Sequence, residues 1–245
     1  MTMAGAAEVA MAARMLARMG FVHAFGHVSG RGPRGVLLTP TSPPLGTLDP
    51  ADVLELDRAG GVLRGLAAHR PLEAPMHLAI YERREDVGAV CRIHSQATTA
   101  WACTGRPPPL LHGFGGIVEP VTVWDDPDLV ASEQVAAEAA GTLGEAPALL
   151  LRGNGALTVG ATLDQALARA WCLEDRCRIA LALRAGDRAG PPLLPAPSPA
   201  EVPAAAPSGA RQVRPFTTDE LDRRRRWYEV EEARLARWLR QTFPG

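Results

Sequence analysis

Short apolar strand patterns alternate with amphipathic helix patterns along most of this chain, and this alternation is its strongest structural constraint. One helix pattern covers residues 4–19 and ends at Gly20, and another covers residues 73–83. An apolar run over residues 87–93 then has the length and composition of a buried strand. Elements that alternate in this way bury their apolar faces by stacking in layers. The pattern therefore predicts a layered α/β fold.

The same patterns divide the chain into three parts. Residues 1–188 are expected to form the layered domain, residues 189–210 are rich in Pro and Ala and typical of an extended linker, and residues 211–245 contain one strong helix. Further strands are expected at 27–31, 35–40, 118–123, 148–151 and 156–159, and further helices at 96–104, 128–143 and 163–184.

The C-terminal helix carries both apolar and charged surface. Thr217 or Thr218 caps it, and acidic residues follow at the positive end of its dipole. Its apolar side chains predict docking on its own domain or on a neighbouring subunit. The four arginines at 223–226 offer charge for phosphate or nucleic acid, but they point in four directions and nearby glutamates can pair with them. We interpret this run as a solvated, ion-paired surface.

The charge balance and the cysteine pattern narrow the class of protein. With 26 basic and 27 acidic residues the formal net charge is −1, which gives no global field for nucleic acid or for an acidic membrane. No apolar run approaches the ~20 residues that span a bilayer, and residues 1–20 predict an amphipathic helix rather than a signal peptide. Four cysteines without a CxxC pair indicate reduced thiols in a cytoplasmic protein.

The chain contains no lysine, because all 26 basic residues are arginine. Schiff-base chemistry through a lysine amine, a lysine-anchored pyridoxal phosphate and a P-loop are therefore excluded.

The stretch CRIHS, residues 91–95, raises the question of what chemistry the domain performs. Two histidines one residue apart at the end of a strand can hold a zinc ion. Here the upstream position is Arg92, and only His94 remains. A guanidinium has no lone pair for a metal and repels a nearby cation. Its planar set of N–H donors can instead bind a carboxylate or a phenolate, so that its positive charge takes the place of the metal's charge.

Four segments in order resemble the class II aldolase/adducin family over roughly residues 5–185. They are GHVSGR, VLLTPTS, EAPMHLAIYERREDVGAVCRIHS and LLLRGNGALTVGATLDQALARAWCLE. The resemblance implies a three-layer α/β/α sandwich around a central mixed, largely antiparallel sheet. It also implies a homo-oligomer, commonly a homotetramer, with sites at subunit interfaces.

The resemblance also implies a site whose metal ligands are altered. In the family, three histidines hold a divalent metal and a glutamate acts as acid or base. The matching glutamate is Glu73 and the one matching histidine is His94, whereas Arg92 and Asn154 stand at the other two positions. Because two of three ligands are replaced, we expect no cofactor.

An alternative keeps a metal. His27, His94 and His112, which lies on the glycine-rich loop LLHGFGG, can rebuild a centre for Zn, Mn or Fe together with Glu73 if they converge in space. In that case His94 is the inherited ligand.

The family's phosphate pocket is altered as well. The positions that bind phosphate in its phosphosugar enzymes hold His27, Ser42, Pro71 and Leu72 here. Proline has no N–H, and a leucine side chain cannot bind an oxyanion. The sequence therefore argues against a sugar-phosphate substrate.

The remaining candidates are expected to bind substrate. Ser29, in GHVSGR, joins His27, Ser42 and Asn154, and Trp101 supplies a flat apolar wall for an aromatic ring. Each has a structural alternative: Asn154 can simply occupy the hairpin turn RGNG, and Trp101 can lie in the core or at a subunit interface. The other histidines are interpreted as structural: His23, His69 and His77.

These residues favour a lyase that acts on a small, non-phosphorylated carboxylate, and the expected reaction is decarboxylation of a hydroxy-aromatic or conjugated acid. Arg92 and Asn154 would hold the substrate's oxygens, Glu73 would deliver a proton to carbon, and His94 or His112 would tune the developing charge. Two alternatives remain open: a retro-aldolase, dehydratase or cyclase on an unphosphorylated carbonyl substrate, and a non-catalytic binding or scaffold protein on an aldolase fold, in which Arg92 is purely structural.

Overall fold

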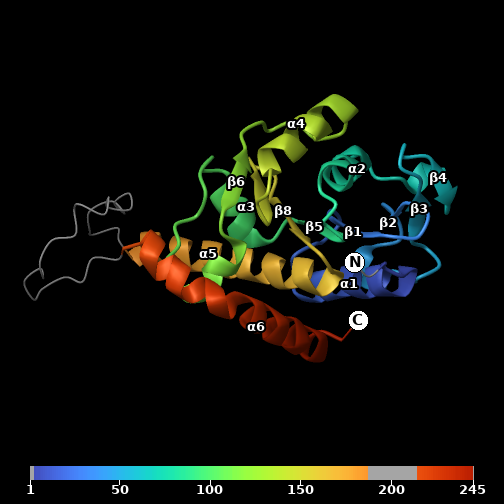
Figure 1. Ribbon diagram of the computed structural model, residues 1–245. Helices are drawn as coiled ribbons and strands as arrows, with labels where there is room; N and C mark the ends of the chain where they lie inside the picture. Colours follow the sequence, from blue (N-terminus) through green and yellow to red (C-terminus); the bar gives the residue numbers. More distant parts are fainter. Residues whose placement is uncertain (1–2, 187–213, 245) are drawn as a thin grey trace, which may run out of the picture.

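An eight-stranded sheet organises the residues that the computed structural model describes, 3–186 and 214–244 (Figure 1). Its strand order is β4-β3-β2-β1-β5-β8-β7-β6, and all neighbours are antiparallel except β6 and β7, which are parallel. The strands are β1 (His27–Arg31), β2 (Val36–Leu38), β3 (Leu54–Leu56), β4 (Val62–Arg64), β5 (Ala89–Ile93), β6 (Val121–Trp124), β7 (Ala148–Leu151) and β8 (Ala156–Gly160).

Helices cover both faces of this sheet. Figure 1 shows α2 (Ala74–Arg83) and α4 (Glu133–Leu143) on one face and α1 (Ala6–Arg18) and α5 (Leu163–Gly186) on the other, with α3 (Gln96–Ala102) packed against α5. Each face has its own apolar core, one with α1 and α5 and one with α2 and α4. The expected three-layer α/β/α sandwich around a mixed, largely antiparallel sheet is confirmed.

The central strand β5 decides which way the candidate residues point. Ala89, Cys91 and Ile93 belong to the core on the α1 and α5 side, whereas Val90 belongs to the core on the α2 and α4 side. Because successive side chains of a strand alternate between faces, Arg92 points toward α2. The α2 face at the end of β5 is therefore where the candidate site has to form.

The C-terminal helix α6 (Thr218–Thr242) packs along α5 and against the short helix η3 (Gly113–Val118) of its own chain (Figure 1). Thr217 caps it in a capping box with Glu220, as the sequence predicts. Glu232, in the middle of α6, accepts hydrogen bonds from Gln165 and Arg169 of α5. The linker expected at 189–210 lies outside the described residues.

Some boundaries differ from the sequence-based expectations. Helix α4 begins at Glu133 rather than near residue 128, because Ser132 is its capping residue and accepts a hydrogen bond from the Val135 N–H. Strand β4 was not expected, and the loop after α3 contains η3. Among the described residues, no helix combines the length and the apolar character needed to cross a membrane.

Candidate functional site

A pocket of about 340 Å³ opens at the ends of the central strands, close to where β5 ends and α2 begins. Its walls come from the segment before β1, the loop after β2, the start of α2 and the loop before α4. The size suits a small molecule. The side chains that matter for its chemistry and shape are His23, Phe25, His27, Leu72, Glu73 and Leu129.

Glu73 is placed at this pocket by the start of α2. It is the residue immediately before the helix, and its backbone carbonyl accepts a hydrogen bond from the Met76 N–H in the first turn. The residue is only 7% exposed, yet it lines the pocket. A carboxyl group in this position is shielded from bulk water and still within reach of a bound ligand.

Arg92 lies directly behind Glu73 and is fully buried. Its Nε and Nη2 atoms lie 3.4 and 3.5 Å from Oε1 of Glu73. Its Nη1 donates to the carbonyls of Ile93, at 2.9 Å, and Ala156, at 3.4 Å. Arg92 is thus held by one carboxylate oxygen and two carbonyls, and it acts on the pocket through Glu73 and through its charge rather than by opening onto it.

Two histidines share this environment. His27 lines the pocket, and burial together with the Arg92 charge lowers the pKa of His27 to about 4. His94 is half-buried, with its ring 6.3 Å from that of Phe25, and burial together with Arg92 lowers the pKa of His94 to about 3. Both imidazoles are therefore neutral at pH 7, so they can donate through one ring nitrogen and accept through the other.

Asn154 reaches the same ends of the central strands through the turn between β7 and β8. Gly155 has φ +75°, and a Cβ atom there would lie 2.2 Å from the carbonyl oxygen of Ile93 and 3.2 Å from Cα of His94. Only a glycine lets the turn approach β5 this closely. Asn154 is half-buried next to Gly155, and neither Asn154 nor His94 lines the pocket of about 340 Å³.

The two serine candidates differ in position. Ser42 is exposed on the loop after β2, between the lining residues Thr41 and Pro43. Ser29 is fully buried, and its hydroxyl is hydrogen-bonded to His77 and Tyr81. The expectation that Ser29 binds substrate is therefore wrong, because its hydroxyl lies beneath the pocket wall and is already engaged.

Two other candidates lie away from the pocket of their own chain. His112 lies before η3, with Nε2 3.6 Å from a carboxylate oxygen of Asp175 of α5. Trp101 is 1% exposed in the core on the α1 and α5 side, and its indole N–H donates to the Arg106 carbonyl. Trp101 as a wall of the pocket is therefore wrong, and His112 does not join His27 and His94 within one chain.

The donors present do not fit the divalent metal that the family resemblance implies. Among the described residues, no group of three or more His, Cys, Asp or Glu side chains is arranged to hold a metal ion. The fully buried Arg92 guanidinium stands beside His94 at the position of a ligand, and Glu73 is paired with it. A divalent cation would lie against this positive charge.

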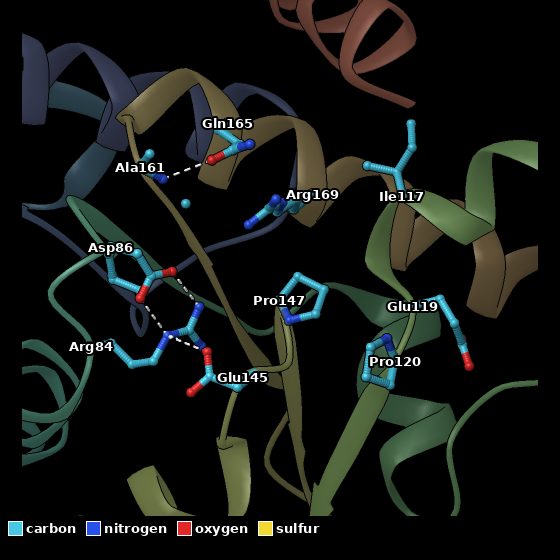
Figure 2. A pocket seen from close by; sticks show the side chains of 12 residues that line it. Arg84, Asp86, Ile117, Glu119, Pro120, Glu145, Pro147, Ala161, Gln165 and Arg169 are labelled. Atoms are coloured by element: carbon cyan, nitrogen blue, oxygen red, sulfur yellow. Dashed lines mark hydrogen bonds and ion pairs between the residues drawn. The ribbon is translucent and has the colours of Figure 1, made fainter. Parts of the chain in front are cut away.

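A second pocket, of about 400 Å³, lies at the opposite ends of the central strands, where β8 ends and β7 begins. Figure 2 shows the side chains that line it. Its charged side chains are already paired. Arg84 binds Asp86 with a two-pronged contact and lies 3.9 Å from Glu145. Arg169 donates to Glu232, and Gln165 accepts from the Ala161 N–H, so this pocket holds no polar group that calls for a ligand.

Sequence reasoning missed the apolar rim of the candidate pocket and the histidine beneath it. Phe25, Leu72 and Leu129 are 73%, 70% and 53% exposed around the opening. His77, interpreted as structural, is fully buried behind His27, with ring centroids 6.3 Å apart. The signal for Leu72 was present in its replacement of a phosphate-binding position, whereas Leu129 approaches from a distant loop that no local pattern reveals.

The family model described as Class II Aldolase and Adducin N-terminal domain matches residues 7–181. A 3,4-dihydroxyphthalate decarboxylase from Arthrobacter keyseri is 30% identical over 210 residues, covering 77% of this chain and 83% of that protein. An L-fuculose phosphate aldolase from Methanocaldococcus jannaschii is 28% identical over 156 residues, covering 64% of this chain and 83% of that protein. Similar proteins thus include both decarboxylases and aldolases.

The fold has close matches among solved structures. An L-fuculose 1-phosphate aldolase from Glaciozyma antarctica PI12 superimposes with a TM-score of 0.74 and 20% identity, covering 97% of this chain and 88% of that one. At this identity the likeness shows the fold alone.

Proposed function

Because this chain belongs to the class II aldolase and adducin family, we propose that it is a lyase that decarboxylates a hydroxy-aromatic or related conjugated acid without a divalent metal. The observation that carries the proposal is the buried Arg92–Glu73 pair, which puts a fixed positive charge and a carboxyl group where the resemblance places a metal and its acid-base partner. The 30% identity to a 3,4-dihydroxyphthalate decarboxylase supports the same reaction class.

The shape of the pocket supports an aromatic substrate over a sugar phosphate. Phe25, Leu72 and Leu129 surround its opening with apolar surface. Among the described lining residues there is no arginine, and a phosphate group would meet Glu73 instead of a cation. A flat ring packs well between such side chains, whereas a phosphate dianion would lose more hydration than a neutral imidazole donor can replace.

In the proposed reaction the acid's ring enters between the apolar side chains, with its carboxylate and hydroxyl oxygens directed inward. His27, which lines the pocket, holds one of these oxygens by a hydrogen bond. Arg92, which contacts Glu73 rather than the substrate, stabilises the negative charge that develops on the hydroxyl oxygen and ring.

Glu73, ionised in its pair with Arg92, first takes the proton of the substrate's hydroxyl group and then delivers it to carbon. A C–H bond forms at the carbon that carries the carboxylate, the C–C bond to that carboxylate breaks, its electron pair restores the ring, and carbon dioxide leaves. The phenolate oxygen of the product then takes a proton from water, and Glu73 is again a carboxylate. Arg92 touches only Oε1 of Glu73 in the described hydrogen bonds, so Oε2 is the oxygen available for this transfer.

A retro-aldolase on an unphosphorylated substrate is the second candidate. The retained Glu73 and the identity to L-fuculose phosphate aldolases favour it. In both reactions a carbanion equivalent forms next to an oxygen, and the same pocket can stabilise it. The products differ, since one reaction releases carbon dioxide and the other an aldehyde.

Assembly is also a proposal. We expect a homotetramer, and α6 offers apolar surface for subunit contacts through Trp227, Val230 and Trp238, which are 52%, 63% and 45% exposed. Light scattering coupled to size exclusion measures the mass directly. A monomer would contradict this expectation.

The function is tested with a panel of 3,4-dihydroxyphthalate, 3,4-dihydroxybenzoate and 4-hydroxybenzoate, with L-fuculose and L-fuculose 1-phosphate as carbonyl substrates. Carbon dioxide and aldehyde are measured in parallel. We expect carbon dioxide from at least one acid, and Glu73→Gln should lower kcat by about 100-fold or more. Glu82→Gln, on the exposed side of the same helix, is the matched control and should leave the rate unchanged.

Each other outcome overturns the proposal. Aldehyde release without carbon dioxide supports the retro-aldolase. An unchanged rate in Glu73→Gln removes Glu73 from the reaction, and no turnover of the whole panel favours a binding protein.

A further inference from the structure

A chain of buried polar side chains runs beneath the pocket, and the reaction proposed above does not use it. The Tyr81 hydroxyl lies 2.9 Å from the Ser29 hydroxyl, and the Ser29 hydroxyl lies 2.8 Å from Nδ1 of His77. Ser29 and His77 are fully buried, and Tyr81 is 4% exposed. Burying three polar groups costs free energy that apolar residues of similar shape would avoid. Their presence therefore calls for a role beyond packing.

The hydroxyl and ring protons of Tyr81, Ser29 and His77 can be placed by counting hydrogen-bond donors and acceptors. If Tyr81 donates to Ser29 and Ser29 donates to Nδ1 of His77, every hydroxyl proton has an acceptor within the chain. If His77 donates instead, the Ser29 proton goes to Tyr81, and the Tyr81 proton has no acceptor among these three groups. Burial lowers the pKa of His77 well below its ordinary value, so the ring is neutral. The first arrangement thus puts the single His77 ring proton on Nε2.

Two buried nitrogens are left without partners at the end of this chain. Nε2 of His77 has no hydrogen-bond partner, and neither has Nδ1 of His27. The two rings meet edge to face, with centroids 6.3 Å apart and an angle of 78° between their planes. A buried donor and a buried acceptor that stay unpaired have lost their hydrogen bonds to water without gaining others, which is unfavourable. At this separation one bridging water, or a small shift of either ring, satisfies both nitrogens.

We propose that His77 is a positioning residue, whose Nε2–H is hydrogen-bonded to Nδ1 of His27, directly or through one water. This bond fixes the His27 tautomer, so that the His27 proton lies on Nε2. The Tyr81–Ser29–His77 chain holds the arrangement from below. His27 lines the pocket, and in this tautomer it presents an N–H donor to an oxygen of the substrate. The inference rests on the proposed function for its purpose, but not for its test.

The test is the tautomer of His27, read from the ¹⁵N shifts of its two ring nitrogens in the full-length protein labelled on histidine. The chain has six histidines, and His27→Gln identifies the signals of His27. In the wild type we expect protonated Nε2 and bare Nδ1. In Ser29→Ala and in His77→Phe we expect mixed tautomers.

Two controls separate positioning from general loss of structure. Ser95 is 1% exposed, and its hydroxyl has no partner, so Ser95→Ala removes an equally buried serine and should leave the His27 signals unchanged. His77→Gln keeps an acceptor and a donor at nearly the same places and should restore much of the single tautomer. If His77→Phe does not fold, Ser29→Ala carries the test.

Turnover gives an independent readout. With 3,4-dihydroxybenzoate or another active acid, Ser29→Ala should lower kcat about tenfold, the worth of one hydrogen bond, with little change in KM. If the His27 tautomer shifts in Ser29→Ala and no acid releases carbon dioxide, the proposed function fails and the positioning role stands. If carbon dioxide is released and the tautomer of His27 is the same in wild type, Ser29→Ala and His77→Phe, the positioning role is overturned.

Discussion

Replacing Arg92 with methionine measures how strongly the buried Arg92–Glu73 pair is coupled. Arg92 is fully buried and Glu73 is 7% exposed. Arg92→Met leaves the Glu73 carboxylate without its counter-charge and removes a donor from the carbonyls of Ile93 and Ala156. Because an uncompensated buried charge remains, we expect the free energy of unfolding to fall by about 3–5 kcal/mol at pH 7.

A double-mutant cycle separates this coupling from lost packing. In Arg92→Met combined with Glu73→Leu no charge is buried, so the double variant should lie within about 2 kcal/mol of the wild type and be more stable than Arg92→Met alone. Arg225→Met is a control, because the pair between Arg225 and Asp222 has side chains that are 62% and 55% exposed. Its loss should change stability by about 1 kcal/mol or less.

Urea unfolding followed by circular dichroism measures five proteins: the wild type, Arg92→Met, Glu73→Leu, the double variant and Arg225→Met. All are compared at one protomer concentration, since subunit association shifts apparent stability. A loss below about 1 kcal/mol in Arg92→Met would refute the reasoning. Strictly additive losses in the double variant would refute it as well, since they would mean that the two side chains do not interact.

Three further predictions concern the elements around the site. Gly155→Ala places a Cβ atom 2.2 Å from the Ile93 carbonyl oxygen at φ +75°, so it should lower the free energy of unfolding by more than about 1 kcal/mol. Gly20 has a similar φ of +71° but open space around its Cβ position. Gly20→Ala should therefore cost less in the same urea experiment. Thr217→Ala removes the hydroxyl oxygen that accepts from the Glu220 N–H, whereas the Glu220 carboxylate keeps its bond from the backbone N–H of residue 217. The loss should cost about 1 kcal/mol and speed amide exchange in the first turn of α6. Equal exchange would contradict the cap. Burial and Arg92 lower the pKa of His27 from 6.5 to about 4, so the unfolded chain binds the proton first as pH falls. The stability that His27 contributes is therefore complete above about pH 6.5 and is lost as pH falls to about 4. Over this range the urea midpoint of His27→Gln should fall less than that of the wild type.

Most of the fold was predictable because its signals are local or belong to the family pattern. The apolar run that became β5, the helix that became α2 and the capping box of α6 each depend on neighbouring residues. The start of α4 was misjudged because Asp126, Asp128 and Ser132 all resemble capping residues, and only the packed helix distinguishes them. Short edge strands such as β4 carry too few residues for a clear period.

The site was predictable only in part, because its geometry depends on distant contacts. The pattern E…R-x-H brings Glu73, Arg92 and His94 to the same ends of the central strands, and the resemblance locates them. It does not reveal that the Arg92 guanidinium is fully occupied by Glu73 and two carbonyls. The separation of His112 from His94 likewise follows from how η3 packs on α5, which sequence spacing does not encode.

The proposed function requires that the Arg92–Glu73 pair acts in place of a metal. The most direct test is the rate of carbon dioxide release from an active hydroxy-aromatic acid before and after dialysis against a chelator, with metal content of the same samples measured by inductively coupled plasma mass spectrometry. If the pair replaces the metal, the rate stays unchanged and the samples contain far less than one metal ion per chain. A rate that is lost on chelation and restored by Zn²⁺, Mn²⁺ or Fe²⁺ would contradict it.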